Sequence, residues 1–406
     1  MSIFIHNFRR WWQPPRNLHD RPEHRQVTFL ELFYDLVYVV LIAELTHALA
    51  SHVDLEHLRN FAFLFIIVWW AWLNGTIYHE LHGNNDIRTR VFTFLQMFTV
   101  AGMAVFAHDA LGETSVGFAL SFTAFQLILT YMWWRTGVHD PNHRPLSRPY
   151  VIAFLINTLL FFASVFVDTP DRFYLWGIAT LISIILPVIM NLMVGRDDPN
   201  IQAQIELSTA STPSLVERFG LFNIIVLGEV LVAVVQGVAG HHDLTLEIGV
   251  IGALGMLIAI GLWWVYFDFV SHRLVRKSVI LAGLWMYMHL LVTAGIATIG
   301  AAVLNVIKHA NTQLPTDVRW LLVVSIAIVL IGISIIMYTL QPRTPFESAD
   351  RKGQIVMMLS SIAIILLGFT TLETIPLLGL VIVFMLAPVL FGLTMWINIV
   401  VASESE

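Results

Sequence analysis

The sequence predicts an all-α polytopic membrane protein with about twelve transmembrane helices. Of its 406 residues, 57% are hydrophobic and only 12% are charged, whereas soluble domains are about 25% charged. Positive residues are concentrated in alternate loops, and short patterns from the first half of the chain recur in the second. Together these observations predict two parallel six-helix repeats, with the N- and C-termini both in the cytoplasm.

Twelve apolar stretches are each long enough to cross a bilayer, which takes roughly 20 residues per helix. The segment before them, 1–27, lacks the long apolar core of a signal peptide. Its Arg9, Arg10, Trp11 and Trp12 are typical of an anchor at the level of the lipid headgroups. We expect helices at 28–50, 58–80, 88–110, 114–135, 149–167, 173–194, 213–237, 246–270, 277–303, 318–340, 353–372 and 375–400.

Lysine and arginine are distributed unevenly over the connections between these stretches. If the N-terminus lies inside, only Arg59, Arg172, Lys308 and Arg319 fall on the outer side. This is a strong positive-inside bias, which sets the orientation of membrane proteins. The cytoplasmic side then holds Arg9, Arg10, Arg16, Arg21, Arg25, Arg88, Arg90, Arg135, Arg144, Arg148, Arg196, Arg218, Arg273, Arg276, Lys277, Arg343, Arg351 and Lys352.

Four short patterns occur twice, in the same order. TFLELF (28–33) corresponds to SLVERF (214–219), and WWAW (69–72) to WWVY (263–266). MFTVAGMAV (97–105) corresponds to LLVTAGIAT (290–298), and LPVIMNLM (186–193) to APVLFGLT (387–394). We interpret them as a tandem duplication, parallel because six helices return the chain to its starting side. The predicted parts are an interfacial segment (1–27), repeat one (28–194), a cytoplasmic connector (195–212), repeat two (213–401) and a cytoplasmic tail (402–406).

Each repeat begins with a hydroxyl residue followed three residues later by glutamate. Thr28 with Glu31 and Ser214 with Glu217 both fit a capping box, in which the two side chains bond each other's backbone N–H groups. Alternatively, the two glutamates face a cytoplasmic vestibule. Arg218 is either an ion-pair partner of Glu217 or a charge that extends to the membrane surface.

Three further ionisable residues of the first stretch, Asp35, Glu44 and His47, are too deep for capping. Helical geometry places Glu44 about 180° from Asp35, so this helix has two polar faces, and we expect it to be buried in the bundle. Asp35 either bonds a tyrosine or tryptophan of another helix or has a functional role, as intramembrane carboxylates often do.

The second half carries its own deep polar residues. Glu229 is expected near the midplane, with Asn223 on the same helix, and His289 is central in 277–303. The repeat alignment pairs His289 with Gln96. Carboxylate and imidazole groups can exchange protons or hold a cation, although a lone buried histidine is more often structural. The predicted substrate- or ion-binding residues are therefore Asp35, Glu44, His47, Gln96, Asn223, Glu229 and His289.

The aromatic pairs Trp69–Trp70 and Trp263–Trp264 occupy equivalent positions in the two repeats. Such residues usually form interfacial belts, but they can also line the path of an organic or cationic solute. The chain has no cysteine, and we identify no metal site, no cofactor motif and no nucleic-acid-binding patch.

Two motifs connect the chain to a known family. ELFYDLVYVVLIAEL (31–45) and ERFGLFNIIVLGE (217–229) resemble the bacterial low-temperature-requirement A (LtrA) family. The matching positions are Glu31, Asp35, Glu217, Arg218, Gly220, Gly228 and Glu229. The resemblance implies a multi-pass protein of the bacterial inner membrane. It also implies a connection with growth in the cold, but it does not indicate a substrate.

The favoured function is secondary transport of a small solute or ion, the proton included, through a protonatable or cation-binding midplane site between the repeats. A second hypothesis is a membrane enzyme or haem protein, with His47 and His289 as ligands. A third is a non-catalytic sensor or scaffold for envelope stress. An enzymatic role is the less favoured, and the oligomeric state cannot be read from the sequence.

Overall fold

The structure is a computed structural model that describes residues 11–20, 25–194, 199–310, 312–343 and 347–404. Within these ranges the regular secondary structure is helical, and Val275 and Leu340 form an isolated β-bridge. Arg9, Arg10, Arg21 and Arg196, which the sequence assigns to the cytoplasmic side, lie outside the described residues.

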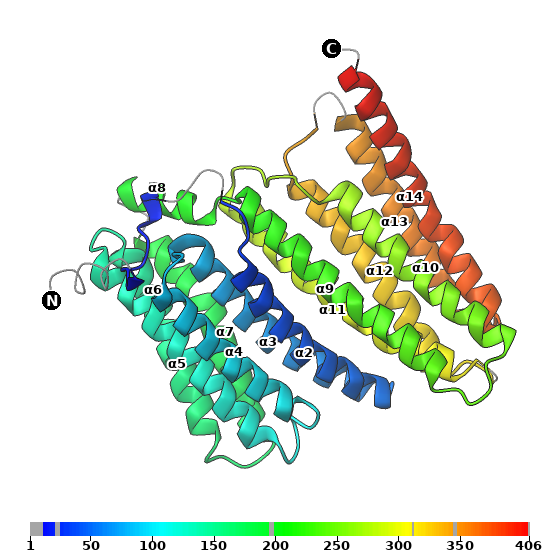
Figure 1. The fold of residues 1–406 in the computed structure, drawn as a ribbon, viewed down its shortest axis with the longest axis horizontal. Coiled ribbons are helices and arrows are strands. Elements are labelled where there is room, and N and C mark those ends of the chain that lie inside the picture. The colour runs from blue at the N-terminus through cyan, green and yellow to red at the C-terminus, as the bar shows by residue number, and fades with distance from the viewer. Residues whose placement is uncertain (1–10, 21–24, 195–198, 311, 344–346, 405–406) are drawn as a thin grey trace. The chain divides into compact units, whose positions relative to one another are not determined.

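Each predicted stretch corresponds to one long helix (Figure 1). Ten candidate spans, one of which joins α8 to α9, are long and apolar enough to cross a membrane. The helices α2 and α13 are not among these spans, and both carry several ionisable residues. The helices are α2 (Phe29–Ser51), α3 (Leu55–His82), α4 (Ile87–Ala107), α5 (Ser115–His139), α6 (Arg144–Ser164), α7 (Asp171–Val194), α9 (Pro213–Ala239), α10 (Leu246–Phe269), α11 (Val279–Lys308), α12 (Thr316–Thr339), α13 (Glu347–Leu367) and α14 (Thr374–Glu404).

Two short helices lie outside the predicted stretches. These are η1 (Leu18–Asp20) in the N-terminal segment and α8 (Pro199–Thr209) in the connector. Most residues of the connector are polar, which predicts a loop. Ile201 and Gln204 of α8 are nevertheless buried, so tertiary packing contributes to the stability of this short helix.

Local sequence defines several of the helix starts. The side chains of Asp86, Thr212, Thr245 and Ser278 accept hydrogen bonds from backbone N–H groups in the first turns of α4, α9, α10 and α11. These are N-caps, which satisfy donors that the helix itself cannot pair. Pro213 then occupies the first position of α9, where a missing N–H has no cost.

The chain forms two compact units. Unit 1 comprises Met1–Leu45 and Phe63–Ala210, and unit 2 comprises Thr46–Ala62 and Ser211–Glu406. The end of α2 and the start of α3 therefore belong to unit 2, where Asn305 Nδ2 donates a 2.8 Å hydrogen bond to the carbonyl of Ala50.

In unit 2, six helices neighbour one another in a closed order: α9, α11, α12, α13, α14, α10 and again α9. In unit 1, α4, α5, α6 and α7 are successive neighbours, and side chains of α3 contact α2 and α4. If α2–α7 are aligned with α9–α14, the neighbours α4–α5–α6–α7 correspond to α11–α12–α13–α14. This agreement is compatible with the duplication, which stays a prediction.

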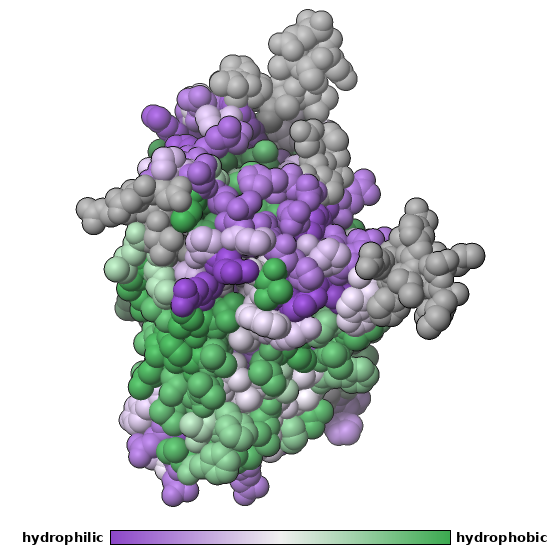
Figure 2. Space-filling model, turned by 90° about the vertical axis from the view of Figure 1, so that its left-hand side faces the viewer, coloured by the Kyte–Doolittle hydropathy of each residue, from purple (hydrophilic) through white to green (hydrophobic). Residues whose placement is uncertain are grey.

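The distribution of side chains suits a lipid environment. Large apolar residues such as Leu159, Phe166 and Val188 are exposed, whereas polar residues such as Asp35 and Gln96 are buried. In Figure 2 the visible face carries a broad apolar area bordered by polar residues at its ends. Lipid-facing helices need this arrangement because the hydrocarbon core offers no partner to a polar group.

Candidate functional site

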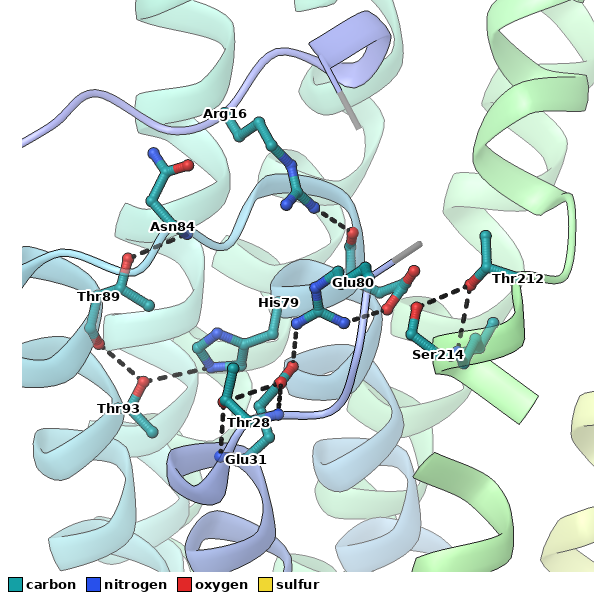
Figure 3. A network of polar contacts seen from close by, with 12 residues as sticks. Arg16, Thr28, Glu31, His79, Glu80, Asn84, Thr89, Thr93, Thr212 and Ser214 are labelled. Atoms are coloured by element: carbon teal, nitrogen blue, oxygen red, sulfur yellow. Dashed lines mark hydrogen bonds and ion pairs between the residues drawn. The ribbon is translucent and has the colours of Figure 1, made fainter. Parts of the chain in front are cut away.

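The start of α2 is held by a reciprocal pair of hydrogen bonds (Figure 3). The Thr28 N–H donates to Glu31 Oε2 at 2.9 Å, and the Glu31 N–H donates to Thr28 Oγ1 at 3.3 Å. This is the geometry of a capping box. It gives Glu31, which is 4% exposed, a structural role at the helix start.

Glu31 also belongs to an ion-pair network. The Arg25 guanidinium bonds both Glu31 and Glu80, with Nη1 2.5 Å from Glu80 Oε2. Both carboxylates are buried, so the Arg25 guanidinium contributes to the compensation of each charge. Arg16 adds a 2.6 Å bond from Nη2 to the Glu80 carbonyl. The sequence predicts only a cytoplasmic position for Arg25, since nothing in the chain order joins it to Glu80.

The start of α9 differs from the sequence prediction. Thr212 is the N-cap, and its Oγ1 accepts from the Leu215 N–H at 3.2 Å. Ser214 is buried within the first turn, with its hydroxyl 3.2 Å from that of Thr212, whereas Glu217 is exposed. The capping box predicted at Ser214 and Glu217 is therefore wrong. Because proline suits the first helical position, Pro213 is the sequence signal that identifies Thr212 as the cap.

Arg218 does not extend to the membrane surface. Its side chain is among the largest that are fully buried, at 1% exposure, while the adjacent Glu217 is exposed. Successive residues of a helix point about 100° apart, so the two side chains take different environments. The interpretation of Arg218 as a surface-reaching charge is wrong.

Asp35 bonds a tryptophan of the neighbouring helix. Its Oδ1 accepts a 2.8 Å hydrogen bond from Trp72 Nε1, and both side chains are fully buried. On the same helix, the hydroxyls of Tyr34 and Tyr38 lie 3.3 Å apart. Gly75 permits this packing, because a Cβ at this position would collide with the Tyr34 hydroxyl. The geometry therefore agrees with one of the two interpretations of Asp35, namely a hydrogen bond to a tyrosine or tryptophan of another helix.

Glu44 and His47 do not form a buried face of α2. Glu44 is half-buried and His47 is exposed. Phe33, Leu36 and Val40 are each about half exposed, so this side of α2 is accessible in the structure. The expectation that the whole helix is buried is wrong, because one polar residue per turn does not decide which face meets other helices.

Gln96 is a buried amide whose two polar atoms are both left unsatisfied by the described residues. It is completely buried in α4, and neither Oε1 nor Nε2 has a hydrogen-bond partner among the described residues. One turn earlier, Thr93 Oγ1 donates to the Thr89 carbonyl and lies 3.4 Å from His79 Nε2. The contrast shows that polar groups on this helix are usually paired, while the Gln96 amide is not.

His289 is surrounded by protein partners in unit 2. Its Nδ1 lies 2.8 Å from the Trp285 carbonyl and its Nε2 lies 3.0 Å from the Tyr266 hydroxyl. A carbonyl only accepts, so Nδ1 carries the proton and Nε2 accepts from the tyrosine. The rings of Phe219 and Trp285 lie 4.9 and 4.5 Å from the imidazole. Both ring nitrogens are therefore occupied in a closed aromatic environment.

The other predicted residues of unit 2 lie on α9. Asn223 is fully buried, and its Nδ2 donates to the Phe219 carbonyl at 3.1 Å. Glu229 is buried at 9% exposure. The α11 backbone approaches it closely at Gly300, where an added Cβ would lie 3.4 Å from the Glu229 carbonyl oxygen. Asn223 and His289 both contact Phe219. The structure therefore brings Asn223 and His289 to the same part of unit 2.

The four tryptophans occupy different environments. Trp69 is fully buried and Trp70 half-buried, whereas Trp263 is 46% exposed and Trp264 half-buried. Trp69 packs against Trp72, with ring centroids 6.1 Å apart. Trp69 thus does not belong to a surface belt, and Trp263 does not face the interior. The two pairs are not equivalent aromatic walls.

A second buried ion pair joins the loop after α10 to α13. Arg273 Nη2 and Nη1 lie 2.6 and 3.3 Å from the Asp350 carboxylate oxygens. Burial lowers the pKa of Arg273, and the nearby Asp350 opposes that effect. The positive-inside pattern predicts the side of the membrane for Arg273 but not its partner, because the two residues are far apart in sequence.

Comparison with known proteins identifies the family. Residues 26–401 match the family described as bacterial low temperature requirement A protein (LtrA). The chain is also 24% identical over 276 residues to an uncharacterized protein of Rhizobium meliloti (strain 1021). That match covers 64% of this chain and 62% of the relative, so it spans less than two thirds of the relative's length. The family match covers nearly the whole chain, and this membrane protein therefore belongs to the LtrA family.

Proposed function

We propose that this protein is a secondary transporter of the bacterial inner membrane that moves a small solute in exchange for, or together with, a proton or another cation. The observation that carries the proposal is the fully buried amide of Gln96, which has no hydrogen-bond partner among the described residues. A membrane-spanning helix with an unsatisfied polar group is unfavourable unless a ligand or water supplies the missing bonds.

The cost of the unpaired amide supports a ligand-binding role. A buried polar group without a partner costs about 1–3 kcal/mol, and replacing glutamine by leucine would remove that cost. An amide offers both a donor and an acceptor, so it suits a solute that carries both. In this proposal the Gln96 amide forms hydrogen bonds with the transported solute.

Buried carboxylates supply candidate groups for coupling. Asp35 and Glu229 lie in long apolar helices and are both buried, and intramembrane carboxylates commonly relay protons or bind cations. Asp35 Oδ1 accepts a hydrogen bond from Trp72 Nε1, which orients the carboxylate. His289 is excluded from this proposal as a coupling group because its two ring nitrogens already bond Trp285 and Tyr266.

The haem hypothesis has less support. Ligation by His289 would require its Nε2 to exchange the Tyr266 hydroxyl for iron, and His47, the other candidate ligand, is exposed. The scaffold hypothesis predicts that neutral replacements of Gln96, Asp35 and Glu229 leave function unchanged. The link to growth at low temperature, which the family description suggests, provides a cellular readout for that distinction.

Flux in reconstituted vesicles tests the proposal. Proteoliposomes loaded with the pH dye pyranine are diluted into buffers that contain Na⁺, K⁺ or one of a panel of amino acids and organic amines. We expect solute-dependent proton movement by the native protein and none by Gln96→Leu. The Gln96→Leu protein should melt at the same or a higher temperature, since it loses an unsatisfied amide.

Gln354→Leu is the matched control. The Gln354 amide donates to the Ser334 carbonyl at 3.4 Å, so the same substitution should retain flux and lower stability slightly. The proposal fails if Gln96→Leu keeps native flux, or if it loses flux only because the protein no longer folds.

The membrane arrangement can be tested with the same cysteine-free chain. We propose two parallel repeats, 28–194 and 213–401, with both termini and the 195–212 connector in the cytoplasm. Single cysteines introduced at Ser208 or Ser403 should react with a membrane-impermeant maleimide only after the cells are opened. Labelling of Ser208→Cys from the periplasm would contradict the parallel arrangement.

A further inference from the structure

Unit 1 contains a surface cavity of about 420 Å³ at the start of α6. Its walls include Arg144, Arg148 and Pro149 of α6, Ile152 one turn further, and Met190 of α7. Because α6 and α7 are candidate membrane spans and Arg144 begins α6, the cavity lies where a span meets the headgroup layer.

The charge of this cavity is one-sided. Arg144 and Arg148 are one helical turn apart and exposed, and no carboxylate is among the described residues that line the cavity. Arg144 uses its Nε to bond the Gly137 carbonyl at 2.8 Å. The Arg148 guanidinium has no hydrogen bond to the described residues. Two like charges at this spacing repel each other, so a bound anion would stabilise the pair.

The acidic residue nearest in sequence is already engaged. Asp140 Oδ1 accepts hydrogen bonds from the backbone N–H groups of Asn142 and His143, at 3.1 and 3.2 Å. It therefore stabilises the turn before α6. The two arginines keep their capacity to bind an external anion.

Another cavity, in unit 2, has both arginines and carboxylates in its lining. It has a volume of about 360 Å³, and its lining includes Arg273 and Arg276 together with Glu347 and Asp350. Arg273 and Asp350 form a buried ion pair. This cavity thus has carboxylates in its lining, one of which forms an ion pair with an arginine, whereas the described lining of the cavity at Arg144 and Arg148 has none.

The remaining lining distinguishes a lipid from a free anion. Pro149, Ile152 and Met190 form an apolar wall beside the arginines. Further along the same helices, Leu155, Leu159, Phe162, Ile185, Val188 and Ile189 are exposed apolar residues that suit an acyl chain. Basic pockets between helices at the cytoplasmic side are typical sites for anionic headgroups. We propose that this cavity binds an anionic phospholipid, with its phosphate on Arg144 and Arg148 and a chain along α6 and α7.

Thermal unfolding of the full-length protein in detergent, with added lipid, tests this site. A ligand that binds the folded state raises the melting temperature by mass action. We expect a larger increase with phosphatidylglycerol than with phosphatidylcholine. In Arg148→Gln, half-maximal stabilisation should need about fivefold more phosphatidylglycerol, which corresponds to about 1 kcal/mol for one cation near the surface. Arg148→Lys should retain most of the effect.

Two controls complete the experiment. Arg90→Gln removes another exposed arginine, which bonds Asn85 outside the cavity, and should respond to phosphatidylglycerol like the native protein. Glycerol 3-phosphate supplies the anion without the chain and should stabilise little. Equal responses of Arg148→Gln and the native protein would overturn the site. Equal stabilisation by glycerol 3-phosphate would overturn its assignment to a lipid.

Discussion

The indole Nε1 of Trp72 donates a 2.8 Å hydrogen bond to Oδ1 of Asp35, and neither side chain is exposed. The bond joins α3 to α2 inside unit 1. A buried carboxylate needs such a donor, because desolvation without compensation is costly. The same bond orients Asp35, which we propose as a coupling group.

Removing the donor should destabilise the protein. Trp72→Phe leaves the Asp35 oxygen without its indole partner, and we expect a loss of about 1–3 kcal/mol in the free energy of unfolding. Urea unfolding in detergent measures this change. Trp69→Phe is the matched control, since Trp69 is equally buried but its Nε1 has no partner among the described residues. Equal losses in the two variants would contradict a special role for the Asp35 bond.

Arg25→Gln should be among the most destabilising changes in unit 1. It removes a cation that bonds both Glu31 and Glu80, which are buried. Breaking a buried pair by deleting one partner costs about 3–5 kcal/mol. The melting temperature should fall strongly, while Arg59→Gln, at an exposed position, should have little effect. A melting temperature that matches the native one would show that the two carboxylates find other compensation.

Tyr266→Phe tests the structural role of His289. The change removes the hydroxyl 3.0 Å from Nε2, and a lost hydrogen bond between buried groups costs about 1–3 kcal/mol. Proton flux should keep its pH dependence, because His289 is not the coupling group. Tyr174→Phe, at an exposed position on α7, should change neither quantity. A shift in the pH dependence of proton flux in Tyr266→Phe would show that His289 takes part in coupling.

Thr212, rather than Ser214, should control the stability of the α9 start. Thr212→Ala removes the acceptor for the Leu215 N–H, and loss of such an N-cap costs about 1 kcal/mol. Thr212→Asn supplies another good capping acceptor and should restore most of that stability. Thermal unfolding distinguishes the two substitutions. If asparagine were as damaging as alanine, capping would not be the reason that Thr212 matters.

Acidification should weaken unit 1 through His143. Burial lowers its pKa below 6.5, the hydrogen bond with Gln204 and the charge of Asp140 oppose this effect, and His19 adds slightly to it. The unfolded chain then binds more protons than the folded protein, so stability falls as the pH drops below about 6.5. This loss levels off below the folded pKa.

His143→Asn removes that titration while keeping a polar side chain. The difference in melting temperature between pH 7 and pH 5 should therefore be smaller in the variant than in the native protein. His108→Asn, at an exposed position of unit 1, is the control. An unchanged pH dependence in His143→Asn would show that other groups cause the acid sensitivity.

The sequence by itself determined the membrane class, the family and the twelve long helices. Apolar stretches of bilayer length and local start signals are properties of neighbouring residues, so they can be read without a structure. The Thr28–Glu31 hydrogen bonds belong to this class. The Ser214 prediction was wrong because two overlapping start signals compete, and the proline geometry favours Thr212.

Only the tertiary structure decided which polar residues are satisfied. Asp35 with Trp72, Arg25 with Glu80, and His289 with Tyr266 are contacts between separate segments, and helical periodicity does not specify the partner of a face. For the same reason the sequence treats Gln96 and His289 alike. In the structure the Gln96 amide has no partner among the described residues, whereas both imidazole nitrogens of His289 are hydrogen-bonded. Depth along a helix is encoded locally, but hydrogen-bond satisfaction depends on what the neighbouring helix presents at that depth.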